Sequence, residues 1–129
     1  MADTPARPDR LIIVLWSAGP ERPVQAAAPF VYALAARALD VPVEMHFTSS
    51  AVRWLVPGVA DTAFTDAAGT KTVADFIGEV KAAGVRLYAC SMAMNEHARG
   101  ESLVPECDGY AGAASVVAAT MLGAKSLVF

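Results

Sequence analysis

The sequence predicts a three-layer α/β/α sandwich around a mostly parallel sheet of four to five strands. Short apolar runs rich in β-branched residues alternate with longer, alanine-rich segments of helical spacing, and turn-forming residues separate the two. Parallel strands need such crossover segments between them. The 129 residues suit one hydrophobic core and contain no linker-like stretch, so we expect residues 1–129 to form a single domain.

The predicted strands are short apolar runs that end at turn formers, as in a sheet that is covered on both faces. They cover residues 11–16, 41–47, 85–89 and 126–129. Residues 57–69 hold no regular period, which is typical of a loop that could contain a short strand near Val59. Residues 99–110 are polar and are predicted to form a connection.

Helices are predicted where apolar or alanine residues recur at helical intervals. They cover residues 21–39, 49–55, 73–83, 91–97 and 111–122. Pro23 fits the first turn of the first helix, and Pro29 is expected to kink it. Residues 48–50 offer a cap for the second helix, Thr72 caps the third, and Gly84 ends the third.

The composition excludes two classes of partner. The net charge is −3, and no basic cluster is present, so we expect no nucleic-acid binding. The longest charge-free stretch, residues 109–124, is interrupted by glycine, serine and threonine, so we expect no membrane span. The hydrophobic share of 55% and the mean hydropathy of +0.41 are high for a monomer, which indicates self-association.

The cysteine content and the first residues together indicate a compartment. Residues 1–10 have neither the basic opening nor the cleavage site of a signal peptide. Two cysteines without a secretory signal are typical of a reducing environment, in which catalytic or redox use of a thiol is commoner than a disulfide framework. We therefore expect the protein to be cytoplasmic.

Cys90 is the leading candidate for chemistry because it lies where a predicted strand hands over to a predicted helix. In an open parallel sheet, ligands bind in the crevice at the carboxyl ends of the strands. A helix N-terminus also offers unpaired N–H groups and partial positive charge, which favour a thiolate over a thiol. The alternative is that Cys90 is a small buried apolar residue, which is the usual fate of a free cysteine.

The residues around Cys90 carry a family resemblance. Residues 88–94, Tyr-Ala-Cys-Ser-Met-Ala-Met, follow a penultimate strand and precede a polar loop and a helix rich in alanine and glycine. This arrangement resembles the DsrE/DsrF-like (DsrEFH-like) family, and residues 43–52 resemble it as well. The resemblance extends over nearly the full length. It implies a Rossmann/flavodoxin-like sandwich formed by one DsrE/DsrF-like domain.

The resemblance also implies a function. The matching cysteine, Cys90, would take a sulfane sulfur as a persulfide and pass it to a partner protein, so sulfur donor and acceptor proteins are expected. It implies a homo-oligomer, a trimer or hexamer, although some sulfur-oxidation members work with related subunits. Residues 95–100 depart from the family pattern by their polarity, which leaves the transfer substrate open.

Cys107 and His97 have both an incidental and a functional interpretation. Cys107 lies in a turn-rich segment flanked by acidic residues, which makes it a poorer nucleophile than Cys90. It is either an incidental loop cysteine or a resolving thiol that attacks an oxidised Cys90. His97 lies nearly two helical turns beyond Cys90, too far for direct proton exchange, and is favoured as a solvated surface residue.

Further residues are expected to form the walls of the Cys90 crevice. They are Ser17, Gly19, Ser91, Met92 and His97. The turn at residues 17–20 lacks the glycine spacing of a nucleotide-binding motif, so we expect no nucleotide, and we expect no other cofactor. Ligand spacing for zinc is also absent, so no metal is expected.

Two further features have structural interpretations. Glu44 and His46 alternate on one strand face, and a satisfied structural pair or an oligomer contact is the favoured interpretation. Trp54 is predicted to belong to the core or to an interface.

Three functions follow in order of preference. The first is a sulfur carrier or sulfurtransferase subunit that uses Cys90. The second is a non-catalytic, oligomeric subunit that binds a small ligand or acts as a scaffold, with Cys90 packed in the core. The third is a peroxidase-like thiol that forms a disulfide between Cys90 and Cys107.

Overall fold

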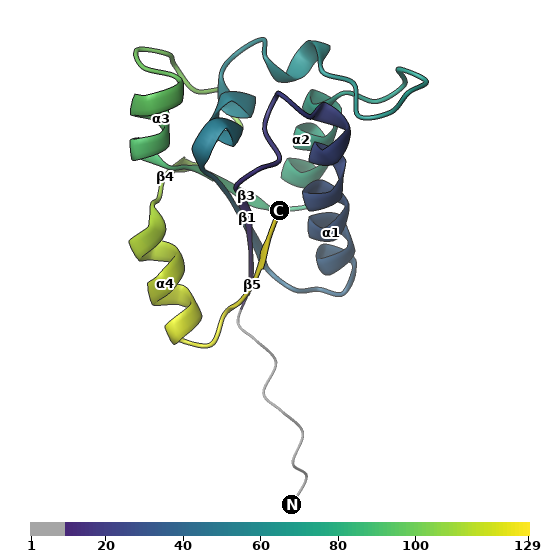
Figure 1. The fold of residues 1–129 in the computed structure, drawn as a ribbon. Helices are drawn as coiled ribbons and strands as arrows, with labels where there is room; N and C mark the ends of the chain where they lie inside the picture. Colours follow the sequence, from purple (N-terminus) through teal and green to yellow (C-terminus); the bar gives the residue numbers. More distant parts are fainter. Residues whose placement is uncertain (1–9) are drawn as a thin grey trace, which may run out of the picture.

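The protein is an α/β/α sandwich around one parallel sheet, as the sequence predicts (Figure 1). The computed structural model describes residues 10–129. Within them the strand order is β4-β3-β2-β1-β5, and every pairing is parallel. The strands are β1 (Leu11–Leu15), β2 (Val43–Phe47), β3 (Arg86–Ala89), β4 (Gly109–Tyr110) and β5 (Lys125–Val128).

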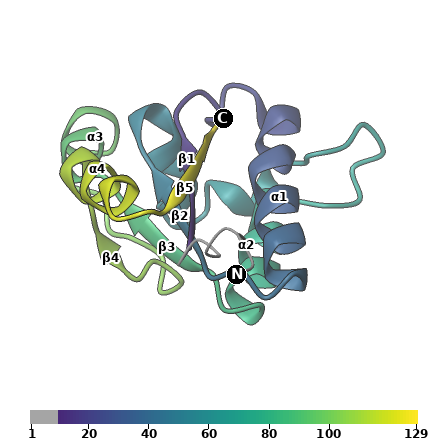
Figure 2. The ribbon, with the colours of Figure 1, turned by 90° about the horizontal axis from the view of Figure 1, so that it is seen from below.

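The helices form a layer on each side of this sheet. Figure 2 shows α1 and α2 on one side and α3 and α4 on the other. The α-helices are α1 (Ala27–Ala38), α2 (Val73–Ala82), α3 (Ser91–His97) and α4 (Ala113–Met121). Shorter 3₁₀ segments complete the helical content: η1 (Pro23–Ala26), η2 (Ser49–Leu55) and η3 (Ala60–Thr62).

The strand register sorts side chains between the two faces of the sheet. Ile13 pairs with Met45 and Val14 pairs with His46, so alternate residues of neighbouring strands share a face. Ile13 and Met45 belong to the large core cluster, whereas Val14 packs against the small cluster formed with Ala119 of α4. Val14 and His46 therefore belong to the α3/α4 face.

The α1/α2 side holds the main core. Phe30 of α1 stacks on Phe76 of α2, with ring centroids 5.6 Å apart, and its ring centroid lies 6.2 Å from that of Phe47. Phe30, Phe47 and Leu87 have no exposed surface. These side chains join helices and strands that are distant in sequence, and their burial is the main contribution to stability.

Helix α4 packs on a second, much smaller apolar cluster. Its buried members are Ile12, Ala119 and Ala124, with Val14 and Val116 packed against them. Ala119 is the only buried residue of α4, while Met121 and Leu122 are 81% and 82% exposed.

Local signals fix the ends of α2. The Thr72 side chain accepts a hydrogen bond from the Asp75 N–H, and the Asp75 carboxylate accepts one from the Thr72 N–H, which forms a capping box. Gly84 follows the helix with a φ of +88°, a conformation that costs a glycine little. Both signals agree with the prediction.

Four local features differ from the prediction. The first helix begins as the 3₁₀ turn η1 rather than as α-helix. Thr48 makes no capping hydrogen bond, and η2 is 3₁₀ throughout. The segment near Val59 leads into a 3₁₀ turn and not a strand, because its backbone hydrogen bonds are local and none of the strands within residues 10–129 pairs with it. The predicted connection 99–110 ends in β4, which extends the sheet by one short strand.

Across residues 10–129, no helix combines the length and the apolar character that crossing a bilayer requires.

Candidate functional site

A cavity of about 670 Å³ opens at the carboxyl ends of the strands on the α3/α4 side. Its walls come from the ends of β1, β2 and β3, from α3 along its length, and from α4 with the residues just before it. The lining residues are Val14, Trp16, His46, Phe47, Thr48, Ser49, Cys90, Met92, Ala93, Asn95, Glu96, His97, Ala111, Gly112, Ala113, Val116 and Val117. Trp16 and Met92 are 61% and 82% exposed, so they lie at its rim.

Cys90 lines this cavity at the point where β3 passes into α3. Its N–H donates to the Phe47 carbonyl at 3.0 Å, which continues the β2–β3 pairing by one residue. Its backbone is extended, and it is the residue immediately before α3. The thiol is free and half-buried, and Sγ takes no capping hydrogen bond. The strand therefore fixes the Cys90 backbone while its thiol stays available to a molecule in the cavity.

His46 lines the same cavity from β2 and is almost fully buried, at 5% exposure. Its Nε2 lies 3.1 Å from Oε1 of Glu44, and Glu44 also pairs with Arg10. The Tyr88 ring lies beside the imidazole, with centroids 5.2 Å apart. Burial lowers the pKa of His46, while the hydrogen bond to Glu44 opposes that change. The ring is thus neutral at neutral pH.

The hydrogen bonding of His46 leaves one nitrogen without a partner. Since a carboxylate only accepts, Nε2 carries the proton that is shared with Glu44, and Nδ1 is an unprotonated acceptor. Nδ1 is buried and has no hydrogen-bond partner among residues 10–129. A buried acceptor in this state is uncommon, and such a group marks a place where a ligand or a proton can bind.

Cys90 and His46 lie close together across the sheet. His46 pairs with Tyr88, and Cys90 follows Tyr88 by two residues on the same strand face. Strand geometry places their Cα atoms about 8 Å apart. A small molecule in the cavity can therefore contact both side chains.

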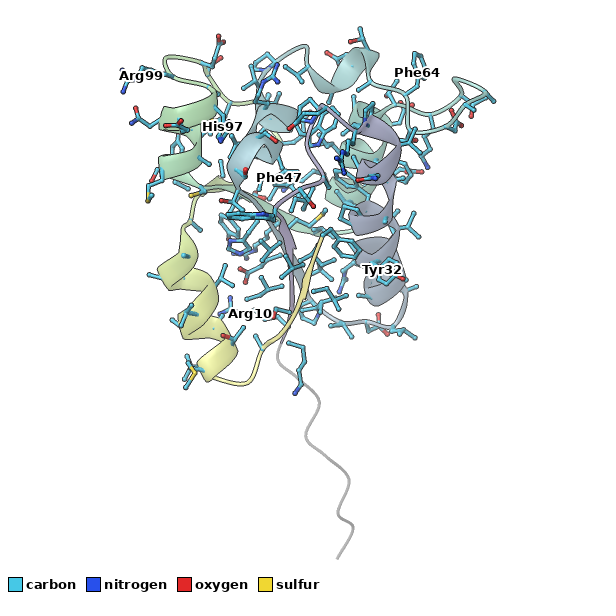
Figure 3. The ribbon with its side chains drawn as sticks, viewed as in Figure 1. Arg10, Tyr32, Phe47, Phe64, His97 and Arg99 are labelled. Atoms are coloured by element: carbon cyan, nitrogen blue, oxygen red, sulfur yellow. The ribbon has the colours of Figure 1, made fainter. Side chains whose placement is uncertain are left out.

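His97 ends α3 and contributes an exposed part of the cavity wall. Figure 3 shows His97 beside the upper part of α3, with Phe47 nearer the centre of the molecule and Arg10 at the opposite end of the sheet. Met92 lines the cavity as well.

Three residues that were expected in the crevice wall lie outside the lining set, namely Ser17, Gly19 and Ser91. The Ser17 N–H donates to the carbonyl of Phe129. Gly19 lies against the hydrogen-bonded side chains of Ser50 and Glu21, and a Cβ on Gly19 would overlap Ser50 Oγ. The Ser91 side chain is exposed.

Cys107 also lies outside the lining set. Its thiol donates to the Gly109 carbonyl at 3.3 Å. Burial raises the pKa of Cys107, and the carboxylate of Asp108 adds to the effect. Burial therefore raises the pKa of Cys107 more than Asp108 does, whereas the sequence suggested the acidic neighbours as the cause.

No cluster with the composition of a metal site exists in the part of the chain that the structure describes, since no three His, Cys, Asp or Glu side chains converge there.

His46 is a residue of the site that the sequence alone does not identify. The available signal was its alternation with Glu44 on a strand that is otherwise apolar. That pattern indicates two polar groups on one face, but only the fold shows that one of them lines the cavity and retains an unpaired nitrogen.

A family model of the DsrE/DsrF-like family matches residues 10–122. The chain belongs to the DsrE/DsrF-like family. The match spans all of the cavity-lining residues. The DsrE/DsrF-like family is generally linked to sulfur relay. No curated protein matches this DsrE/DsrF-like sequence.

Two solved structures share the fold of this DsrE/DsrF-like chain. The YchN protein from E. coli is 14% identical, with a TM-score of 0.73, and the match covers 94% of this chain and 99% of YchN. MTH1491 from Methanobacterium thermoautotrophicum, a protein of unknown function, is 21% identical, with a TM-score of 0.64 and coverage of 93% and 98%. At these identities the similarity shows the fold alone.

Proposed function

We propose that the protein is a small sulfur-carrier or sulfurtransferase subunit that holds sulfane sulfur as a persulfide on Cys90. The observation that carries this proposal is the placement of Cys90: a free, half-buried thiol that lines a 670 Å³ cavity at the carboxyl end of the sheet. The family's general link to sulfur relay supports the same assignment.

The proposed reaction has two displacement steps. The Cys90 thiolate attacks the outer sulfur of a donor persulfide, so a new S–S bond forms on Cys90 while the donor S–S bond breaks and the donor leaves as a thiolate. An acceptor thiolate then attacks the outer sulfur of the Cys90 persulfide and returns Cys90 to its thiolate. No net oxidation or reduction occurs, and the cavity gives the transferred sulfur room beside the helix.

Sulfur loading tests this proposal directly. The protein is incubated with inorganic polysulfide and its intact mass is measured with and without a reductant. We expect the wild type to gain one sulfur atom in a reducible form, Cys90→Ser to gain none, and Cys107→Ser to load like the wild type. Loading that persists in Cys90→Ser, or a folded wild type that takes no sulfur, contradicts the proposal.

We also propose that the chain is a homo-oligomer, a trimer or hexamer, and that it works in the cytoplasm, where both thiols stay reduced. The support is an exposed apolar surface on α4 and the edge strand β5. Its members are Val117, Met121, Leu122, Leu127 and Val128. Helix α4 leads through a short turn into β5, which forms one edge of the sheet (Figures 1 and 2). An exposed apolar patch next to an unpaired strand edge is typical of an interface.

The oligomer can be tested by light scattering on size-fractionated protein. We expect a mass of three or six chains for the wild type, and a smaller particle when Met121 and Leu122 are both changed to lysine. Val24→Lys, at an apolar site that is 64% exposed on η1, is the matched control and leaves the mass unchanged. A wild type that is monomeric at all concentrations contradicts this part of the proposal.

The rival function is a subunit that binds a small ligand without sulfur chemistry. The size of the cavity favours it, because 670 Å³ falls within the range of sites for small molecules. Alkylation separates the two functions: the relay requires rapid, stoichiometric labelling of Cys90 in the folded protein near neutral pH, whereas a packed core cysteine stays inert.

A further inference from the structure

We propose that the cavity beside Cys90 binds a small, uncharged molecule with an apolar body, which donates one hydrogen bond to Nδ1 of His46. This inference goes beyond sulfur relay, because it concerns what the cavity recognises and requires no sulfur chemistry.

The walls of the cavity select an apolar body. Most of the lining comes from aliphatic and aromatic side chains, including Val14, Trp16, Val116 and Val117, and from the small residues at 111–113. The volume of 670 Å³ accommodates a bicyclic aromatic molecule or one of similar size. Binding such a molecule removes its apolar surface from water, which is the main driving force for sites of this kind.

The charges around the cavity select against anions. Among residues 10–129, no arginine or lysine lines it. Its charged or titratable lining groups are Glu96 and His97, which are exposed, Cys90, which is half-buried, and His46, which is buried and neutral. Arg10 pairs with Glu44 and is not among the residues that line the cavity. A carboxylate or phosphate on the ligand therefore meets no fixed cation, while Glu96 repels it.

His46 supplies the polar recognition. Glu44 fixes the tautomer by accepting from Nε2–H, so Nδ1 is the acceptor that remains. Nδ1 is closed to solvent in this structure and has no partner in the described part of the chain, so the proposed hydrogen bond requires the imidazole to turn toward the cavity when the molecule binds. Leaving such an atom unpaired is unfavourable, so a hydroxyl or N–H of the bound molecule gains a hydrogen bond without displacing another one. The Tyr88 ring on the neighbouring strand packs beside the imidazole, with ring centroids 5.2 Å apart.

Three naphthalene probes test the inference on the wild-type protein near neutral pH. The first, 2-naphthol, has an apolar body and a donor; 2-methoxynaphthalene lacks the donor; 2-naphthoate is an anion. Protein-observed NMR gives the affinity of each and locates it through the amides of Ala93 and Gly112. We expect 2-naphthol to bind several-fold to about tenfold more tightly than its methyl ether, the gain from one neutral hydrogen bond. We expect no detectable binding of 2-naphthoate.

Variants and a direct spectroscopic signature complete the test. His46→Phe should abolish the preference for naphthol over the ether, while Tyr88→Phe, which retains the acceptor, should keep it. Should His46→Phe not fold, the ¹⁵N resonance of Nδ1 in the wild type still decides, because it shifts on hydrogen bonding to naphthol and not on binding the ether. Equal affinities for naphthol and ether, tightest binding of naphthoate, or shifts that map to another surface each overturn the inference.

The outcome is separable from that of sulfur relay, because the probes contain no sulfur. A protein that binds naphthol but takes no sulfur from polysulfide retains this inference and loses the relay. A protein that loads sulfur on Cys90 but shows no preference among the probes retains the relay and loses this inference.

Discussion

The two sides of the sheet are built differently. On the α1/α2 side, Phe30, Phe47 and Phe76 are buried in one continuous cluster with the strands. On the other side, α3 adds Ala93 and Met94 to the main cluster, whereas α4 covers only the small cluster of Ile12, Ala119 and Ala124 among the described residues, and a cavity takes the place of further packing. The difference separates two tasks. One helix layer supplies most of the burial that stabilises the fold, and the other leaves room for a ligand beside Cys90.

The same contrast extends to the outer surface. Helix α2 buries Val73, Phe76, Ile77 and Val80, whereas α4 buries only Ala119. A helix that buries so little of its apolar surface gains little stability from its own chain. The α3/α4 side is therefore the one on which a partner chain or a ligand adds most to the packing.

The largest expected effect is the difference in the free energy of unfolding between two leucine-to-alanine variants, one on each side of the sheet. Leu87→Ala removes a side chain with no exposed surface from the main core, and we expect a loss of about 2–5 kcal/mol in the free energy of unfolding. Leu122→Ala removes the same atoms from a position that is 82% exposed, so the loss in a dilute, monomeric sample should stay within about 0.5 kcal/mol. Urea denaturation measures both.

These two variants also test the comparison between the two sides of the sheet. A large loss from Leu122→Ala that grows with protein concentration would show that the exposed side is covered in an oligomer, because dissociation then contributes to unfolding. A small loss from Leu87→Ala would mean that the α1/α2 side is not the stabilising layer.

The next effect concerns Asp108, which holds β4 against β3. Its Oδ2 accepts from the Leu87 N–H at 2.8 Å and from Lys81 Nζ at 2.6 Å, and its own N–H donates to the Leu87 carbonyl. Burial acts to raise the pKa of Asp108, but these two hydrogen bonds outweigh burial and lower it. Asp108→Ala leaves the Leu87 N–H unpaired, and since Asp108 is partly exposed we expect a loss of about 1–2 kcal/mol.

Lys81→Ala is the matched control for Asp108. It removes only the exposed ion pair and should cost about 0–1 kcal/mol. If Lys81→Ala and Asp108→Ala cost the same in chemical denaturation, the ion pair and not the bond to the strand holds β4.

The capped helix α2 gives a smaller effect. Thr72→Ala removes half of the capping box and should cost about 1 kcal/mol. Cys90, which occupies the equivalent position before α3, makes no capping hydrogen bond, so Cys90→Ala should show no such loss. Thermal unfolding monitored by circular dichroism compares them, and an equal drop in Tm for both variants would show that Cys90 has a structural role as a cap.

Local patterns in the sequence predicted the features that depend on neighbouring residues. The Thr72 cap, the stop at Gly84 and the strand-to-helix junction at Cys90 each depend on a few consecutive residues. Met92 and His97 share the cavity with Cys90 because they belong to the helix that it begins.

Features that depend on distant residues could not be predicted in this way. Strand β4 is only two residues long, and the Asp108–Leu87 contacts that position it join segments far apart in the chain. The wall that α4 contributes, at Val116 and Val117, follows from how that helix packs across the sheet. The unpaired nitrogen of His46 is a property of the packed interior, which no pattern of residue types specifies.

The smallest effect is a dependence of stability on pH that comes from His46. Because burial lowers the pKa of His46 in the folded state, the unfolded chain takes up the proton first as the pH falls. Stability is therefore complete above the ordinary histidine pKa of about 6.5 and declines as the pH falls from there toward the lower folded-state value. Glu21, Asp66 and Asp108, whose pKa values are also lowered, act only near or below about pH 4.

The sequence contains two histidines, so the assignment can be made with one variant of each. His46→Phe should remove the decline in Tm between about pH 7 and pH 5, whereas His97→Gln, at an exposed position, should keep it. The opposite result, in which His97→Gln removes the decline, would mean that the buried side of the cavity does not favour a neutral imidazole. Nδ1 of His46 would then not be available as an acceptor. The cavity side of the sheet would lack the polar group that is proposed to bind a ligand.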